Sequence, residues 1–216
     1  MKSDETEFWQ TRYLAGKMPW DFHGVPCALT SWLNTATPPG RVLIPGCGSG
    51  YEVKAFHDAG WDVVAIDYTP AAVARARAAL GALGDKVLLA DFFTRAFSGP
   101  KFDFVYERTF LCSFPPERWP PYARSMAGLL AERGQLVGFF LYGYEDDPPP
   151  YPLTAEAAQA LFGKHFVRVA DETATDSLPL FEGRERWQVW RRTSAPLDGG
   201  EVHARYHPTG REETQG

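Results

Sequence analysis

The sequence predicts an α/β fold in which a seven-stranded, mostly parallel sheet carries helices on both faces. Two observations support this prediction. From residue 41 onward, short apolar runs that fit buried strands alternate with segments of helical periodicity, as the crossovers between parallel strands require. In addition, 216 residues with 44% hydrophobic content and no internal repeat suit one domain with one sizeable core.

The predicted strands and helices follow one another regularly in the first part of the chain. The strands span 41–45, 61–66, 86–90, 102–106, 135–142, 166–170 and 186–191. A glycine-rich turn follows the first strand, and Thr69 with Pro70 marks the start of a helix after the second. The expected helices cover 51–59, 70–80, 119–130 and, with Thr154 as N-cap, 155–162.

The end of the chain departs from this alternation. An acidic, proline-rich loop at 143–152 precedes the last helix, and no clear helix separates the last two strands, which predicts an antiparallel pair at one sheet edge. From Ser194 onward, glycine, proline and charged residues dominate, so that we expect a disordered tail. The predicted domain therefore covers residues 1–193, followed by a tail at 194–216.

Charge and cysteine usage argue against several classes of function. A net charge of −5, with lysine and arginine scattered along the chain, argues against nucleic acid as a partner. The start MKSDETEFWQ lacks the features of a secretory signal, and no apolar run approaches the roughly 20 residues of a membrane helix. The three cysteines form no ligand cluster, so that no metal site is expected. We expect a cytoplasmic protein without a membrane partner, as a monomer or weak dimer.

The most informative segment is VLIPGCGSG at 42–50, where a strand runs into a glycine-rich turn before a helix. Glycines at such a turn adopt backbone conformations that other residues avoid and let a ligand approach closely. The spacing is G-x-G-x-G rather than the G-x-G-x-x-G of dinucleotide-binding sheets, and methyltransferases favour the former. A glycine turn between strand and helix also occurs as ordinary structure.

Polar groups follow the next two strands as well. Asp67 ends the apolar run WDVVAI, 21 positions after Gly46, where a carboxylate can accept hydrogen bonds from both ribose hydroxyls. Asp91 and Phe92 follow the third strand, where a polar group and a ring can hold an adenine. Each feature alone also fits an ordinary strand-end turn. Because ligands of open α/β sheets bind beyond the carboxyl ends of the strands, the three features together predict a nucleoside site.

With these motifs, the chain resembles the thiopurine S-methyltransferase superfamily and, within it, the thiol and halide methyltransferase branch. The resemblance spans residues 8–192 and rests on FWQTRYLAGKMPWD, VLIPGCGSG with AIDYTP, FDFVYERTFLCSF, PPPY and GRERWQVWRR. It implies a Rossmann-like class I methyltransferase that uses S-adenosylmethionine, with N-terminal helices in 1–35 that act as a lid over this cofactor.

The resemblance also assigns roles by position. The residues implied to contact the cofactor are Trp9, Trp20, Gly46, Gly48, Asp67, Tyr68, Asp91, Phe92 and Glu107. Arg108 and Thr109 would line the site after the fourth strand. Ile44 stands where many methyltransferases have an acidic residue, as in the thiol and halide branch. The pair Glu107-Arg108 lies between the Asp-Tyr of the halide branch and the Asp-Arg of the thiopurine enzymes, which leaves the acceptor open.

Methyl transfer from a sulfonium is an in-line displacement, so that the protein has to align the acceptor and needs no covalent intermediate. Aromatic faces attract the sulfonium cation, and the rings expected nearest to it are Trp9, Trp20, Tyr68 and Phe110. A thiol needs no strong base, because a fraction is ionised near neutral pH, and Arg108 would raise that fraction. His23 is the candidate base for a nitrogen or hydroxyl acceptor, and Tyr142, at the end of the fifth strand, completes the candidate catalytic set.

The predicted function is methyl transfer to a small molecule, first of all a thiol. Nitrogen heterocycles, halides and selenium or tellurium compounds are alternative acceptors, and a non-catalytic S-adenosylmethionine-binding protein is an alternative of another class. A nicotinamide oxidoreductase should show G-x-G-x-x-G, and this chain has G-x-G-x-G in its place, which argues against that class. A nucleic-acid adenine methyltransferase carries its Asp-Pro-Pro-Tyr signature after the fourth strand, whereas Asp147-Pro-Pro-Pro-Tyr151 follows the fifth.

Overall fold

The computed structural model describes residues 3–36, 40–97 and 99–194, so that 195–216 of the predicted tail lie outside it. Its strands are β1 (Arg41–Pro45), β2 (Asp62–Asp67), β3 (Val87–Leu89), β4 (Phe102–Arg108), β5 (Leu130–Leu141), β6 (Phe166–Thr173) and β7 (Glu185–Arg192). Its α-helices are α1 (Ser3–Leu14), α2 (Cys27–Thr35), α3 (Tyr51–Asp58), α4 (Pro70–Leu80), α5 (Trp119–Leu129) and α6 (Ala155–Phe162). Short 3₁₀ helices are η1 (Gly81–Lys86), η2 (Leu111–Ser113) and η3 (Pro116–Arg118). None of the helices in the described ranges has the length and apolar character needed to cross a membrane.

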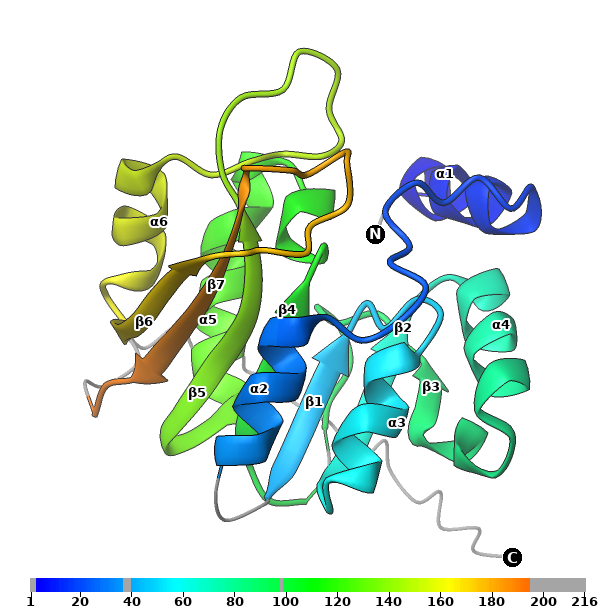
Figure 1. Ribbon diagram of the computed structural model, residues 1–216, viewed down its shortest axis with the longest axis horizontal. Coiled ribbons are helices and arrows are strands. Elements are labelled where there is room, and N and C mark those ends of the chain that lie inside the picture. The colour runs from blue at the N-terminus through cyan, green and yellow to red at the C-terminus, as the bar shows by residue number, and fades with distance from the viewer. Residues whose placement is uncertain (1–2, 37–39, 98, 195–216) are drawn as a thin grey trace, which may run out of the picture.

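All the strands belong to one seven-stranded sheet in the order β3-β2-β1-β4-β5-β7-β6 (Figure 1). Strands β3, β2, β1, β4 and β5 run parallel, whereas β7 runs antiparallel to both of its neighbours, β5 and β6. The mostly parallel sheet and the antiparallel pair at its edge are thus as predicted. A loop without a helix joins β6 to β7, and such a connection suits antiparallel neighbours.

The alternation of side chains along each strand builds one core on each face of the sheet. On β1, Leu43 belongs to the core that α5 and α6 cover, while Val42 and Ile44 belong to the core beneath α2, α3 and α4. A parallel sheet buried on both faces requires near-continuous apolar strands, as this sequence has.

Three strands differ from the prediction by more than one residue, and one of them, β6, continues to Thr173, three residues beyond its predicted end at 170. Strand β4 continues to Arg108, two residues beyond its predicted end. Strand β5 begins at Leu130, five residues before its predicted start at 135. Leu130 already pairs with Phe102, and a local irregularity follows at which Arg133 has a φ of 64° and the register shifts. Pairing with β4 thus starts this strand earlier than the run of apolar residues predicted.

The two N-terminal helices, both predicted to belong to a lid, lie at different places in the fold. In α2, Leu29 is fully buried and the Trp32 ring lies 4.9 Å from the Phe104 ring, so that this helix covers the sheet. Helix α1 lies beyond the carboxyl ends of the strands, next to α4 (Figure 1). The Gln10 Oε1 atom accepts a hydrogen bond from the Ala71 N–H at 2.9 Å, so that α1 caps the start of α4.

Candidate active site

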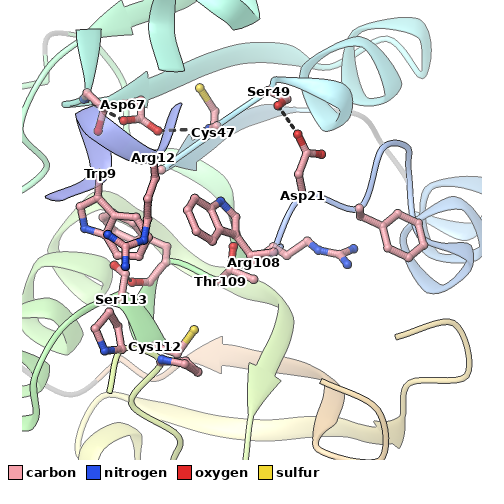
Figure 2. Close-up of a pocket in the computed structure, with 18 of the residues that line it drawn as sticks. Trp9, Arg12, Asp21, Cys47, Ser49, Asp67, Arg108, Thr109, Cys112 and Ser113 are labelled. Carbon is pink, nitrogen blue, oxygen red and sulfur yellow. Dashed lines mark hydrogen bonds between the residues drawn. The ribbon is translucent and has the colours of Figure 1, made fainter. Parts of the chain in front are cut away.

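A cavity of about 410 Å³ lies at the carboxyl ends of β1, β2 and β4, beneath the lid segment, by which we mean residues 3–24. Cavities of this volume commonly bind small molecules and cofactors. The predicted site residues that line it are Trp9, Trp20, Gly46, Gly48, Asp67, Tyr68, Arg108, Thr109 and Phe110. Figure 2 shows these walls, with Trp9 and Arg12 on the side of Asp67 and the Asp21 side chain on the side of Ser49. In the described part of the chain, no group of three or more His, Cys, Asp or Glu could hold a metal ion.

The glycine loop after β1 forms the floor of the cavity. Gly46 and Gly48 have φ angles of 63° and 51°, which side chains other than glycine rarely adopt. A Cβ atom at Gly46 would lie 2.4 Å from the Phe110 ring, and one at Gly48 would lie 2.8 Å from the Tyr13 hydroxyl. The loop therefore needs glycine at both positions, and the lid residue Tyr13 lies directly against it.

Asp67, the last residue of β2, connects the second strand to this loop. Its Oδ2 atom accepts the Gly48 N–H at 3.1 Å, and its Oδ1 atom accepts the Thr69 N–H at 2.8 Å. Thr69 stands at the N-cap of α4 as predicted, but its side chain makes no capping hydrogen bond. Burial raises the pKa of Asp67, while these N–H groups act to lower it. Since a carboxylate has about four acceptor positions, Asp67 can still accept hydrogen bonds from a ligand.

Aromatic rings of the lid segment enclose the cavity from above. The Trp9 and Trp20 rings meet edge to face at 5.1 Å between centroids, and the Tyr13 and Trp20 rings do so at 6.0 Å. Burial and the nearby Asp67 charge raise the pKa of Tyr13, which stays a neutral phenol. Such a set of rings suits a cation that is removed from water.

Arg108, the last residue of β4, brings a buried positive charge to the cavity wall. Only 9% of this residue is exposed, and its guanidinium carbon lies 4.5 Å from the Phe22 ring centroid and 4.8 Å from that of Phe139. Burial raises the pKa values of Glu52 and Glu185, and the Arg108 charge acts against this rise in both. The guanidinium is therefore held by two rings and attracted by two carboxylates.

Glu107 was predicted to contact the cofactor, but its side chain points to the other face of the sheet. Tyr106 and Arg108 line the cavity, and the alternation along β4 turns the residue between them away. The Glu107 carboxylate accepts the N–H groups of Phe110 and Leu111, each at 2.9 Å, and the Tyr122 hydroxyl at 2.5 Å. It thus organises the turn after β4 from within the core.

Four further predicted residues, His23, Tyr142, Asp91 and Phe92, also lie outside the cavity lining. The His23 side chain is 70% exposed, and Tyr142 forms hydrogen bonds with Gln188 at 3.0 and 3.2 Å. Phe92 packs in the core against Phe110, and Asp91 Oδ1 accepts the Phe93 N–H in a local turn. A general-base role for His23 or Tyr142 has no support from this arrangement.

Several lining residues were missed from the sequence, chiefly Arg12, Tyr13, Asp21 and Glu52. A signal existed for two of them, because Phe8 and Arg12, and likewise Trp9 and Tyr13, are four residues apart and lie on one helix face. Asp21 directly follows the predicted Trp20, but nothing in the sequence indicates what its carboxylate contacts.

The fold and this site can now be compared with known proteins. The family model of thiopurine S-methyltransferase matches residues 4–194. A probable thiol methyltransferase 2 of Arabidopsis thaliana is 30% identical, over 90% of this chain and 88% of that protein. Thiocyanate methyltransferase 1 of the same plant is 28% identical, over 88% of this chain and 87% of that protein.

Solved structures agree on the fold. The 1,6-didemethyltoxoflavin-N1-methyltransferase of Burkholderia thailandensis, solved with S-adenosylhomocysteine and 1,6-didemethyltoxoflavin, superposes with a TM-score of 0.70 at 18% identity, covering 87% of each chain. The predicted Rossmann-like class I fold is confirmed. Together with the family match, these findings show that the chain is an S-adenosylmethionine-dependent methyltransferase and that it belongs to the thiopurine S-methyltransferase family.

Proposed function

We propose that the protein methylates the sulfur of a small thiol that binds beside Arg108. The observation that carries this proposal is the buried guanidinium in the cavity wall, at the end of β4 and between two aromatic rings. A guanidinium stabilises a thiolate, because a nearby positive charge lowers the pKa of a thiol. The names of the thiol and thiocyanate methyltransferases among the relatives agree with a sulfur acceptor.

The residues present fit the cofactor. Bare glycine backbone at Gly46 and Gly48 leaves room for close approach, and we propose that Asp67 binds the ribose hydroxyls. Trp9, Trp20 and Tyr68 would surround the sulfonium, as their place on the cavity wall allows. Asp91 and Phe92 remain proposed adenine contacts that would need a shift of their loop.

The charge of the cavity favours a thiol over a bare anion. Acidic side chains outnumber basic ones among the described lining residues, with Asp21, Glu52, Asp67, Glu145 and Asp147 against Arg12 and Arg108. Arg184 neutralises Glu145 at 3.3 Å. A thiol enters uncharged and ionises next to Arg108, whereas thiocyanate or a halide has to enter as an anion against this field.

The chain contributes alignment and electrostatics rather than covalent chemistry. When bound, S-adenosylmethionine supplies a methyl group on a sulfonium, whose sulfur keeps the electron pair of the broken bond as the acceptor sulfur forms its new bond to carbon. Arg108 holds the acceptor as thiolate, and the thiol proton goes to solvent. The lid rings exclude water from the methyl group. Leu180 and Phe181 from the loop before β7 add an apolar wall for the acceptor.

Labelled methyl transfer against a panel of acceptors tests this proposal. The panel contains an aromatic thiol, thiocyanate, iodide and a nitrogen heterocycle, each read by the mass of its product. We expect the thiol to give the highest kcat/KM. Methylation of iodide or of the heterocycle without methylation of any thiol would refute the proposal, and cofactor binding without turnover would favour the non-catalytic alternative.

A monomeric or weakly dimeric state, a cytoplasmic location and the extent of the domain, 1–193, stay predictions. Size-exclusion chromatography with light scattering measures the first of these directly.

A further inference from the structure

A carboxylate of the lid segment is fixed against the glycine loop. The Asp21 side chain is 5% exposed, and its Oδ2 atom accepts the Ser49 hydroxyl at 2.6 Å. Its Oδ1 atom accepts the His23 N–H at 3.0 Å. Both Asp21 and Ser49 line the cavity. Figure 2 shows Asp21 and Asp67 on opposite sides of Cys47, so that the loop carries one carboxylate at each side.

The negative charge of Asp21 is only partly balanced. The basic side chains near it are His23, whose Nδ1 atom lies 3.6 Å from Asp21 Oδ1, and Arg75, whose Nη2 atom lies 3.8 Å from Asp21 Oδ2 and whose Nε atom donates to Ser49 Oγ at 3.0 Å. The Arg75 side chain is 43% exposed and absent from the cavity lining, so that water screens this pair from outside. Within the cavity, the Asp21 charge acts to raise the pKa of both Tyr13 and Glu52. The carboxylate therefore still presents negative potential to a ligand in the cavity.

The orientation of the cofactor follows from the strand order. Strand β3 lies beyond β2, on the side away from β1, so that the nucleoside end of the ligand belongs near Asp67. The amino-acid end then has to lie across the loop, on the side of Ser49. Strand β1 ends in the apolar Ile44 and Pro45, so that it offers no acidic side chain to that end.

We propose that Asp21 binds the α-ammonium group at the amino-acid end of S-adenosylmethionine. An ammonium has three N–H donors and fits a buried carboxylate that keeps free acceptor positions. Because Asp21 belongs to the lid segment, the same contact couples occupancy of the cofactor site to the position of the lid. The inference rests on the cofactor assignment and is independent of the acceptor.

Calorimetric titration with two ligands tests this role. S-adenosylhomocysteine carries the amino-acid end, whereas 5′-methylthioadenosine keeps the adenine, the ribose and the thioether but lacks it. We expect Asp21→Asn to weaken binding of S-adenosylhomocysteine by about tenfold to hundredfold and to leave 5′-methylthioadenosine unchanged within about twofold. Asp67→Asn is the matched control, because it should weaken both ligands through the ribose that they share.

Equal weakening of both ligands by Asp21→Asn would show that Asp21 only holds the lid, and no weakening would also overturn the proposal. If this variant does not fold, the wild-type protein still gives an answer. An analogue of S-adenosylhomocysteine with hydrogen in place of the α-amino group should bind as weakly as the natural ligand binds to Asp21→Asn, and equal affinity for both would refute the contact. Failure of the wild type to bind S-adenosylhomocysteine would instead refute the cofactor assignment.

Discussion

The buried carboxyl of Glu107 makes a quantitative prediction about stability and pH. Glu107 is 1% exposed, and burial raises its pKa from the ordinary 4.5 to about 7, although three hydrogen bonds act to lower it. In the variant Glu107→Gln, the amide oxygen can still accept the N–H groups of Phe110 and Leu111, and the amide nitrogen can donate to the Tyr122 oxygen. The variant thus keeps the shape and the hydrogen bonds of the Glu107 side chain but has no group that titrates.

The direction in which stability changes with pH follows from the number of protons that the folded and unfolded chains bind. Between pH 4.5 and pH 7 the folded chain holds a proton on Glu107 that the unfolded chain has already lost, so that stability falls as the pH rises through this range. The difference between the two pKa values corresponds to about 3 kcal/mol, most of which is lost between pH 5 and pH 8. Because the side chain is buried, solvent screening does not reduce this figure appreciably.

Urea unfolding of the wild type and of Glu107→Gln between pH 5 and pH 8, followed by tryptophan fluorescence, measures this effect. The other titrating groups are common to both proteins, so that the difference between their free energies of unfolding isolates Glu107. We expect this difference to move in favour of the variant by about 2 to 3 kcal/mol from pH 5 to pH 8. Parallel curves would mean that Glu107 titrates normally and that water reaches it.

Three further outcomes are expected. Asp67→Ala should raise the Kd of S-adenosylhomocysteine by about a hundredfold, since two ribose hydroxyls lose a charged acceptor, and calorimetry showing less than a threefold change in a folded variant would remove Asp67 from the site. Arg108→Ala should lower kcat/KM for the acceptor by about tenfold to hundredfold and leave cofactor affinity nearly unchanged, because the lost contact belongs to the acceptor. Steady-state kinetics that keep full efficiency would contradict the acceptor site. Amide hydrogen exchange over residues 8–20 should slow when S-adenosylhomocysteine binds, as expected for a lid that orders over the cofactor. The same exchange with and without this ligand would contradict a moving lid.

Much of the fold follows from local patterns in the sequence. The apolar runs predicted the strands to within three residues at every end but the start of β5, and Thr154 accepts the Ala157 N–H at 3.1 Å as the predicted N-cap of α6. Gly46, Gly48 and Asp67 could be assigned to one site from the sequence, because β1 and β2 are parallel neighbours whose carboxyl ends meet. Local chemistry and sheet topology suffice for such residues.

Other assignments depended on contacts that no local pattern encodes. Side chains alternate with a period of two along a strand, so that the two extra residues of β4 decide that Arg108 faces the cavity and Glu107 the core. Pairing between β4 and β5 sets that length, and it is a long-range interaction. The sequence placed both residues at the site but could not orient them.

The fold class and the site residues can thus be separated into those that the sequence determined and those that only the tertiary structure decided. By itself the sequence determined the class of fold, the glycine loop with its acidic partner and the family of methyltransferases, because each depends on neighbouring residues or on the order of strands. Only the tertiary structure decided that α2 packs on the sheet, that Tyr13 lies over Gly48, and that Asp21 reaches Ser49. These contacts join residues far apart in sequence, and their energies depend on burial and distance, which exist only once the chain has folded.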